Sequence, residues 1–183
     1  MKALLIVDLQ NDFCPKGALP APHGDRIVSV INRMLDKFDY VLASKDWHPV
    51  DSIHFDTWPV HCVRDTPGAE FHPDLDVSKL NMVFLKGTDN KDDGYSAFEA
   101  TNENLAEYLR QKKISELYVA GLTTEYCVKQ TVRDALRYGF KTFLIEDAIQ
   151  GICKNENDVP NAIAEMKNAG ASIVNVDDIV NDF

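Results

Sequence analysis

Several features that define protein classes are missing from this sequence. Its 183 residues contain 19 Lys and Arg against 29 Asp and Glu, which gives a formal net charge of -10, and no run of basic residues occurs. Because nucleic-acid binding depends on clustered Lys and Arg, this charge balance excludes a nucleic-acid partner. The first apolar run ends at Asp8 and is too short for a signal peptide, so we expect no membrane association.

Cysteine is scarce and unpatterned. Cys14, Cys62, Cys127 and Cys153 show no paired spacing. This distribution is typical of free thiols in a reducing compartment rather than of a disulfide framework, so we expect a cytoplasmic protein. Two nucleotide-binding motifs are absent as well: no Gly-x-Gly-x-x-Gly follows a strand-like run, and there is no P-loop.

Apolar runs typical of buried parallel strands alternate with segments of helical spacing throughout the chain. The strands are predicted at residues 3–7, 40–43, 82–85, 117–120, 140–145 and 172–174. Apolar positions with helical spacing lie at residues 27–38, 105–109, 128–136 and 163–166. This alternation predicts a single α/β domain over residues 1–183: a doubly wound, mostly parallel six-stranded sheet of order 3-2-1-4-5-6, with helices on both faces.

The stretch LYVAGLTTEYCV at residues 117–128 combines a strand, a turn at Gly121 and the start of a helix. Thr123 and Thr124 are residue types that cap helices, so Cys127 is predicted in or just before the first helical turn. The free amides and positive dipole end of a helix favour thiolate and can hold an oxyanion, which indicates a nucleophile. The competing interpretation is a buried structural cysteine.

Asp8, Lys86 and Cys127 are each predicted where a strand ends, on one edge of the sheet. A thiol nucleophile, its base and a cation require such a group. Lys86 would lie two strands from Asp8, about 10 Å, a gap that an extended lysine can largely cover. Taken singly, such an aspartate is more often a cap or metal ligand, and such a lysine is more often solvated.

A long polar loop, residues 45–73, carries Asp46, His48, His54 and His61. Imidazole and carboxylate suit one borderline divalent metal ion, such as zinc, iron or manganese, and Asp46-x-His48 places two ligands on one extended segment. The alternative is that these histidines are ordinary surface-loop residues.

Four aromatic residues are predicted in loops near these groups and are suited to sandwiching the flat ring of a small-molecule substrate. They are Phe13, Trp58, Tyr95 and Phe98, and for Phe98 core packing is an equal alternative.

At these residues the sequence resembles the isochorismatase-like hydrolases, and within them the nicotinamidase/pyrazinamidase enzymes, over nearly the whole chain. The resemblance is carried by IVDLQNDF at residues 6–13, KDWH at 45–48, WPVHCV at 58–63, TPGA at 66–69, FLKG at 84–87, YSAF at 95–98 and GLTTEYCV at 121–128. It implies hydrolysis of nicotinamide to nicotinate and ammonia through a cysteine thioester, in NAD salvage, with activity on pyrazinamide-type amides.

The resemblance also implies roles for individual residues. The implied catalytic triad is Asp8, Lys86 and Cys127. The implied metal ligands are Asp46, His48, His61 and, at a position that varies among family members, His54. A cis peptide bond between Leu122 and Thr123 would direct the amide of Thr123, together with that of Cys127, into an oxyanion hole.

Two other functions stay open from the sequence. A ureido- or carbamoyl-amide hydrolase of the same family would use the same triad. From another class, a phosphoacceptor receiver domain also has an acidic cluster after its first strand and a lysine at a strand end. That alternative explains neither Cys127 nor the histidines, and it needs an aspartate where Lys86 stands. Whether the chain forms a homo-oligomer is also open.

Overall fold

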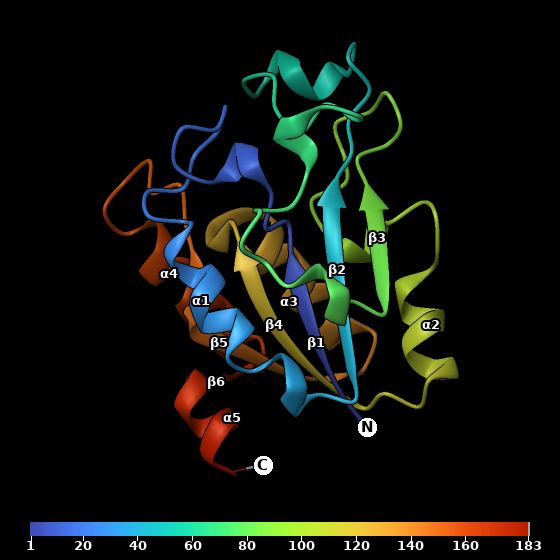
Figure 1. Ribbon diagram of the computed structural model, residues 1–183, viewed down its shortest axis with the longest axis vertical. Coiled ribbons are helices and arrows are strands. Elements are labelled where there is room, and N and C mark those ends of the chain that lie inside the picture. The colour runs from blue at the N-terminus through green and yellow to red at the C-terminus, as the bar shows by residue number, and fades with distance from the viewer. Residues whose placement is uncertain (183) are drawn as a thin grey trace.

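The computed structural model describes residues 1–182 of the chain. In this part, six strands form one sheet in the order β3-β2-β1-β4-β5-β6, and every neighbouring pair runs parallel (Figure 1). The strands are β1 (Lys2–Val7), β2 (Tyr40–Asp46), β3 (Met82–Lys86), β4 (Glu116–Leu122), β5 (Lys141–Gln150) and β6 (Ser172–Val174). The predicted doubly wound sheet and its strand order are confirmed.

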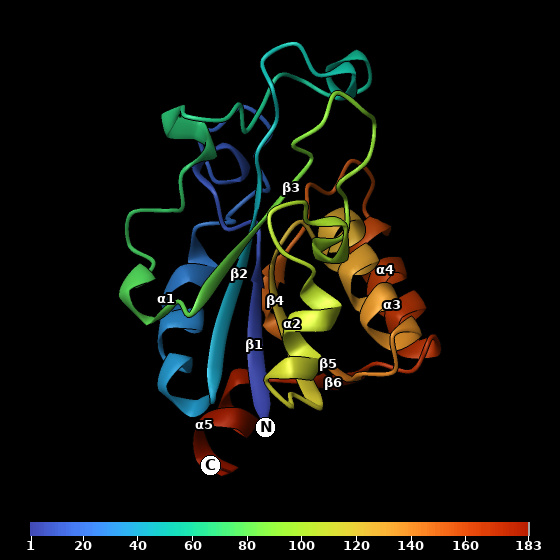
Figure 2. The same cartoon turned by 90° about the vertical axis from the view of Figure 1, so that its right-hand side faces the viewer.

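Helices cover both faces of the sheet. Figure 2 shows α1 and α5 on one side and α2, α3 and α4 on the other. Their bounds are α1 (Arg26–Asn32), α2 (Leu105–Gln111), α3 (Lys129–Arg137), α4 (Asp158–Asn168) and α5 (Val176–Asp182). Because strand side chains alternate between faces, Leu4 and Ile6 of β1 join the core under α1, whereas Leu5 and Val7 join the core under α2 and α3.

Several helix and strand limits differ from the predictions. Helix α1 ends at Asn32 and is followed by a separate 3-10 turn, Leu35–Lys37, because apolar spacing does not distinguish one helix from a helix with a displaced turn. Strand β5 extends to Gln150, past a register shift against β4. Helix α5 was not predicted, since it is short and buries few apolar residues.

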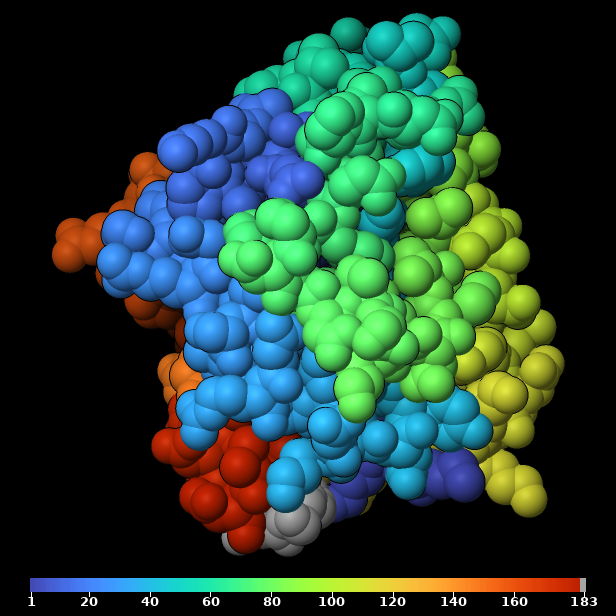
Figure 3. All heavy atoms as spheres, in the orientation of Figure 1, coloured from blue at the N-terminus to red at the C-terminus, as the bar shows by residue number. Residues whose placement is uncertain are grey.

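The loops at the carboxyl ends of the strands build the upper part of the molecule. Figure 3 shows the long connection after β2, coloured cyan to green, beside the blue loop that follows β1. The two segments are joined by the Asn11 amide, which donates to the Glu70 carbonyl oxygen at 2.9 Å. The polar residues that end separate strands therefore lie close together beneath these two loops. None of the helices within residues 1–182 has both the length and the apolar character that crossing a membrane requires.

Candidate active site

Asp8, Lys86 and Cys127 meet at the carboxyl edge of the sheet. Asp8 follows β1, Lys86 ends β3, and Cys127 lies in the turn after β4. Strand β2 lies between β3 and β1, and the Lys86 ammonium lies 2.7 Å from Asp8 Oδ2 and 3.4 Å from Cys127 Sγ. All three side chains are buried. The structure thus brings together the three groups that the strand order predicted to be neighbours, and lysine is long enough to span the gap.

Lys86 also contacts the histidine-rich loop. Its ammonium donates to Asp46 Oδ1 and, at 2.7 Å, to the carbonyl oxygen of Gly94. Burial would lower the pKa of Lys86, but the carboxylates of Asp46 and Asp8 raise it well above its usual value. A fully buried, charged ammonium therefore holds two carboxylates together.

Burial raises the pKa values of both Asp8 and Cys127. Burial raises the pKa of Asp8, and Lys86 opposes this shift without reversing it. Burial likewise raises the pKa of the Cys127 thiol well above its ordinary value, again against Lys86. This loss of solvation opposes the predicted preference for thiolate at the helix start.

The turn that carries Cys127 depends on glycine. Gly121 pairs with Val7 and has φ +117°, and a Cβ at this position would lie 2.1 Å from the Val7 carbonyl oxygen. The peptide bond between Leu122 and Thr123 is cis, as the resemblance implied. Residues 124–128 then form a π-helical turn that leads into α3, so Cys127 does lie in the first turn.

The predicted capping by threonine is wrong. Thr123 is the N-cap residue, but within residues 1–182 its side chain makes no capping hydrogen bond, and the buried Thr124 Oγ1 has no hydrogen-bond partner. The carbonyl oxygen of Thr123 instead accepts from the amides of Tyr126 and Val128, at 3.1 and 3.2 Å. Wide, π-type bonding at the start of the helix replaces the side-chain cap.

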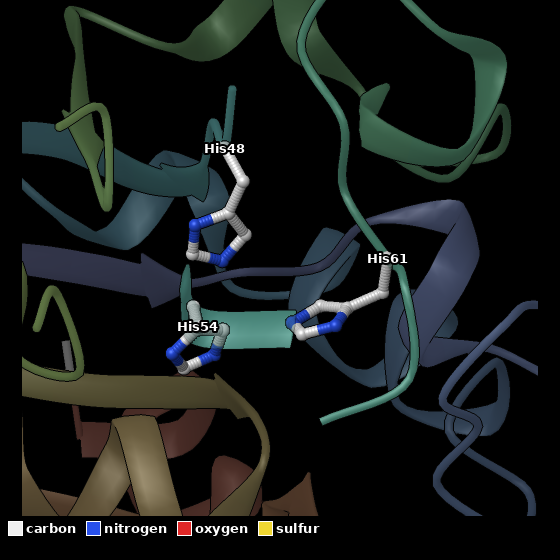
Figure 4. Close-up of side chains that lie close together, drawn as sticks. All are labelled: His48, His54 and His61. Carbon is white, nitrogen blue, oxygen red and sulfur yellow. The ribbon is translucent and has the colours of Figure 1, made fainter. Parts of the chain in front are cut away.

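His48, His54 and His61 form a buried cluster, and Figure 4 shows their rings turned toward one another. One ligand atom from each lies within 4.8 Å of those of the others. Each Nδ1 contacts an acceptor: Gly87 O at 3.0 Å for His48, Asp92 Oδ1 at 2.7 Å for His54, and Pro59 O at 2.6 Å for His61. Since each Nδ1 then carries the hydrogen, each Nε2 keeps a lone pair for another partner.

This cluster fits a metal ion. Asp46 Oδ2 lies 3.5 Å from His48 Nε2 and 3.7 Å from His61 Nε2. Burial would raise the pKa of Asp46, but the Lys86 ammonium lowers it well below its ordinary value, so the carboxylate is ionised. Among the described residues, His48 Nε2 is one of the few buried polar atoms without a hydrogen-bond partner. A buried lone pair of this kind, next to an ionised carboxylate, suits a borderline divalent cation.

A small cavity opens beside both groups. Asp46, the three clustered histidines and Cys127 line it. Phe13, Trp58 and Tyr95 line it too, as predicted, whereas Phe98 packs against Tyr138 and Phe140 instead. Trp58 Nε1 donates to the Tyr95 hydroxyl at 2.9 Å, and Phe13 packs against His61 with ring centroids 5.4 Å apart. The cavity thus offers a thiol, a donor cluster for a cation and flat apolar walls to one small molecule.

The comparisons with known proteins agree with this geometry. The isochorismatase domain matches residues 2–178. The chain belongs to the isochorismatase family. The nicotinamidase of Escherichia coli (strain K12) is 40% identical, covering 97% of this chain and 96% of that protein. The pyrazinamidase of Pyrococcus horikoshii in complex with zinc has a TM-score of 0.86 and 42% identity, covering 95% of this chain and 98% of that one. The PnC1 structure from L. infantum in complex with nicotinate has a TM-score of 0.89 and 32% identity, covering 96% of this chain and 92% of that one.

Membership of this family of hydrolases removes the receiver-domain alternative. It also directs attention to site residues that sequence reasoning missed. Ser44 Oγ donates to Asp8 Oδ1 at 2.7 Å, and its polarity within the buried strand β2 was the available signal. The side-chain amide of Gln10 donates to the backbone carbonyl oxygen of Asp46 at 2.8 Å and accepts from the backbone amide of Asp46 at 2.9 Å. Asp92, which contacts His54, carried no signal in the sequence.

Proposed function

We propose that this family member hydrolyses nicotinamide to nicotinate and ammonia, and pyrazinamide-type amides likewise, as an enzyme of NAD salvage. The observation that carries the proposal is one small aromatic cavity lined by both the Cys127 thiol and the histidine cluster. The nicotinamidase and pyrazinamidase relatives support it. We further propose that residues 1–183 act as one hydrolase domain in the cytoplasm, although residue 183 lies outside the described part.

The first step is attack by Cys127 on the amide carbon. Asp8 accepts the thiol proton as the sulfur–carbon bond forms, since a carboxylate oxygen of Asp8 lies within 4.8 Å of Cys127 Sγ. The raised pKa of Asp8 makes it a stronger base than an ordinary carboxylate. Lys86, 2.7 Å from Asp8 and 3.4 Å from Sγ, stabilises the negative charge as it moves between them.

The attack produces a tetrahedral intermediate with a negative oxygen. We assign its stabilisation to the amides of Thr123 and Cys127, and each such donor typically contributes about 3 kcal/mol to the transition state. The cis bond before Thr123 and the helical turn around Cys127 are the backbone features that support this assignment.

Asp8 then returns its proton to the leaving nitrogen, and ammonia departs as the carbon–nitrogen bond breaks. The cysteine thioester remains. Asp8, ionised again, takes a proton from water, whose oxygen attacks the thioester carbon. Collapse of the second intermediate releases nicotinate, and the sulfur regains its proton from Asp8. One carboxylate thus serves both half-reactions.

We assign Asp46, His48, His54 and His61 as the residues that would hold one divalent ion, with zinc, iron and manganese as candidates. When bound, such an ion supplies a Lewis acid beside the cavity that orients a ring nitrogen. Phe13, Trp58 and Tyr95 confine the ring from the remaining sides.

A ureido- or carbamoyl-amide hydrolase would use the same thiol and base. Its linear substrates, however, carry no ring that flat aromatic walls would confine, so the cavity favours an aromatic amide. The test is ammonia release by the purified protein from nicotinamide, pyrazinamide and a linear carbamoyl amide. Release from the linear amide alone would overturn the proposal.

A further inference from the structure

Asp92 lies outside the cavity but contacts two residues that line it. Its Oδ1 accepts a hydrogen bond from His54 Nδ1 at 2.7 Å and another from the Tyr95 hydroxyl at 3.3 Å. Tyr95 in turn accepts from Trp58 Nε1 at 2.9 Å. One carboxylate oxygen therefore connects the histidine cluster to the aromatic wall.

The chemistry of these groups fixes the direction of every bond. An indole nitrogen only donates, so Tyr95 must use its lone pair for Trp58 and its hydrogen for Asp92. An ionised carboxylate only accepts, so His54 must carry its hydrogen on Nδ1. His54 Nε2 is then left with a lone pair, and hydrogen bonds that run in one direction strengthen one another.

His54 differs from its two neighbours in what holds it. His48 and His61 contact backbone carbonyl oxygens, of Gly87 and Pro59, which no side-chain substitution removes. The ring nitrogen of His54 contacts the side chain of Asp92 instead. This makes the orientation of His54 dependent on one residue that can be substituted without touching the cavity lining.

Asp92 is itself held in place on both sides, although its side chain is 48% exposed. On one side, Asn90 Oδ1 accepts from the Ile53 amide at 2.7 Å, which ties the loop to the short helix that carries His54. On the other side, the Gly94 carbonyl oxygen accepts from Lys86 at 2.7 Å. Gly94 has φ +81°, and a Cβ there would lie 2.3 Å from the Gly87 amide nitrogen, so the chain passes too closely for another residue.

We infer that Asp92 is a positioning residue: it fixes the tautomer and orientation of His54 for metal binding and, through Tyr95, links that ligand to the aromatic wall. The inference rests on the metal binding included in the proposed function. Loss of a carboxylate that orients a ligating histidine typically lowers metal affinity about 10- to 100-fold. Since Asp92 is half exposed, we expect the lower end of that range.

The experiment measures Zn²⁺ affinity by competition with a chromophoric chelator, on metal-stripped protein and without substrate. Asp92→Ala should weaken binding about tenfold. Asp92→Asn should weaken it less, because its amide oxygen still accepts from His54. Asp89→Ala is the matched control: it removes a negative charge from the same loop, but its carboxylate contacts Lys91 rather than the cluster, so affinity should stay at the wild-type value.

A double-substitution cycle separates positioning from simple attraction of a cation. If Asp92 acts through His54, then Asp92→Ala should cause no further loss in a His54→Ala background. An equal loss in both backgrounds, or wild-type affinity in Asp92→Ala, would overturn the inference. A wild-type protein that binds zinc but releases no ammonia from nicotinamide would overturn the proposed activity and leave the role of Asp92 standing.

Discussion

Replacing Lys86 with Ala is the most informative single change, because this ammonium is shared by the triad and the histidine-rich loop. It contacts Asp8 Oδ2 and Gly94 O, each at 2.7 Å, as well as Asp46 Oδ1, and it is completely buried. The variant would leave two buried carboxylates with no cation between them. Both stability and turnover should therefore fall.

The size of the effect follows from burial. Removing one partner of a buried ion pair typically costs about 3–5 kcal/mol, because the remaining charge stays desolvated. For a chain of this length that corresponds to a fall in Tm of roughly 6–20 °C. Lys141→Ala is the control: its pair with Glu116, at 2.8 Å, is at the surface, where such pairs contribute about 0–1 kcal/mol.

The pH dependence gives a sharper check. Without Lys86, burial would raise the folded-state pKa of Asp8 and Asp46 above the unfolded value of about 3.9. A raised pKa contributes stability that is complete below the unfolded pKa and is lost as pH rises through the folded pKa. The deficit of Lys86→Ala against wild type, measured by urea unfolding of metal-free protein, should therefore be smaller at about pH 5 than at about pH 7.5.

Turnover should fall by about 100-fold or more at neutral pH, because a protonated Asp8 cannot act as the base. Two results would refute the reasoning: a deficit in unfolding free energy below about 1 kcal/mol, comparable to an exposed pair, or a deficit that does not change with pH. Either would mean that Asp8 and Asp46 do not depend on Lys86 for their charge.

Three further changes test other parts of the site. Cys127→Ala should abolish ammonia release from nicotinamide with little change in Tm, whereas Cys153→Ala, at an exposed cysteine, should retain it; turnover in the first variant would exclude Cys127 as the nucleophile. Elemental analysis should find about one divalent transition-metal ion per chain, and His54→Ala should retain less; full retention would remove His54 from the ligand set. Gly121→Ala should lower the urea midpoint by at least the equivalent of about 1–3 kcal/mol, since its Cβ would lie 2.1 Å from a backbone oxygen at φ +117°; an unchanged midpoint would contradict the required close approach.

Much of this site follows from the sequence because parallel strands end on a common edge. The end of an apolar run located Asp8, and strand order together with the length of a lysine side chain predicted that Lys86 reaches it. The donor types at Asp46 and His48 sufficed to suggest a metal. These inferences need only periodicity, strand order and residue chemistry, all of which are local or topological.

Other features depend on three-dimensional packing that no local pattern encodes. Asp92 is one of several acidic residues in its loop, and only the path of that loop brings it, rather than Asp89, to His54. The sign of the shift in the Cys127 pKa was missed for a similar reason. A helix start is visible in the sequence, but the extent of burial is set by elements far away along the chain.

Charge balance explains why the thiol and the histidine cluster belong to one site. Asp8 is fully buried and Asp46 is nearly so. The ammonium of Lys86 contacts both carboxylates. The Nδ1 atoms of the clustered histidines face acceptors, which leaves their Nε2 lone pairs for a cation. A cation bound at Asp46 Oδ2 would offset the second carboxylate and let Lys86 act more strongly on Asp8 and Cys127. Such a cation would therefore couple binding at the histidines to the reactivity of the thiol through the contacts that Lys86 makes with Asp46, Asp8 and Cys127.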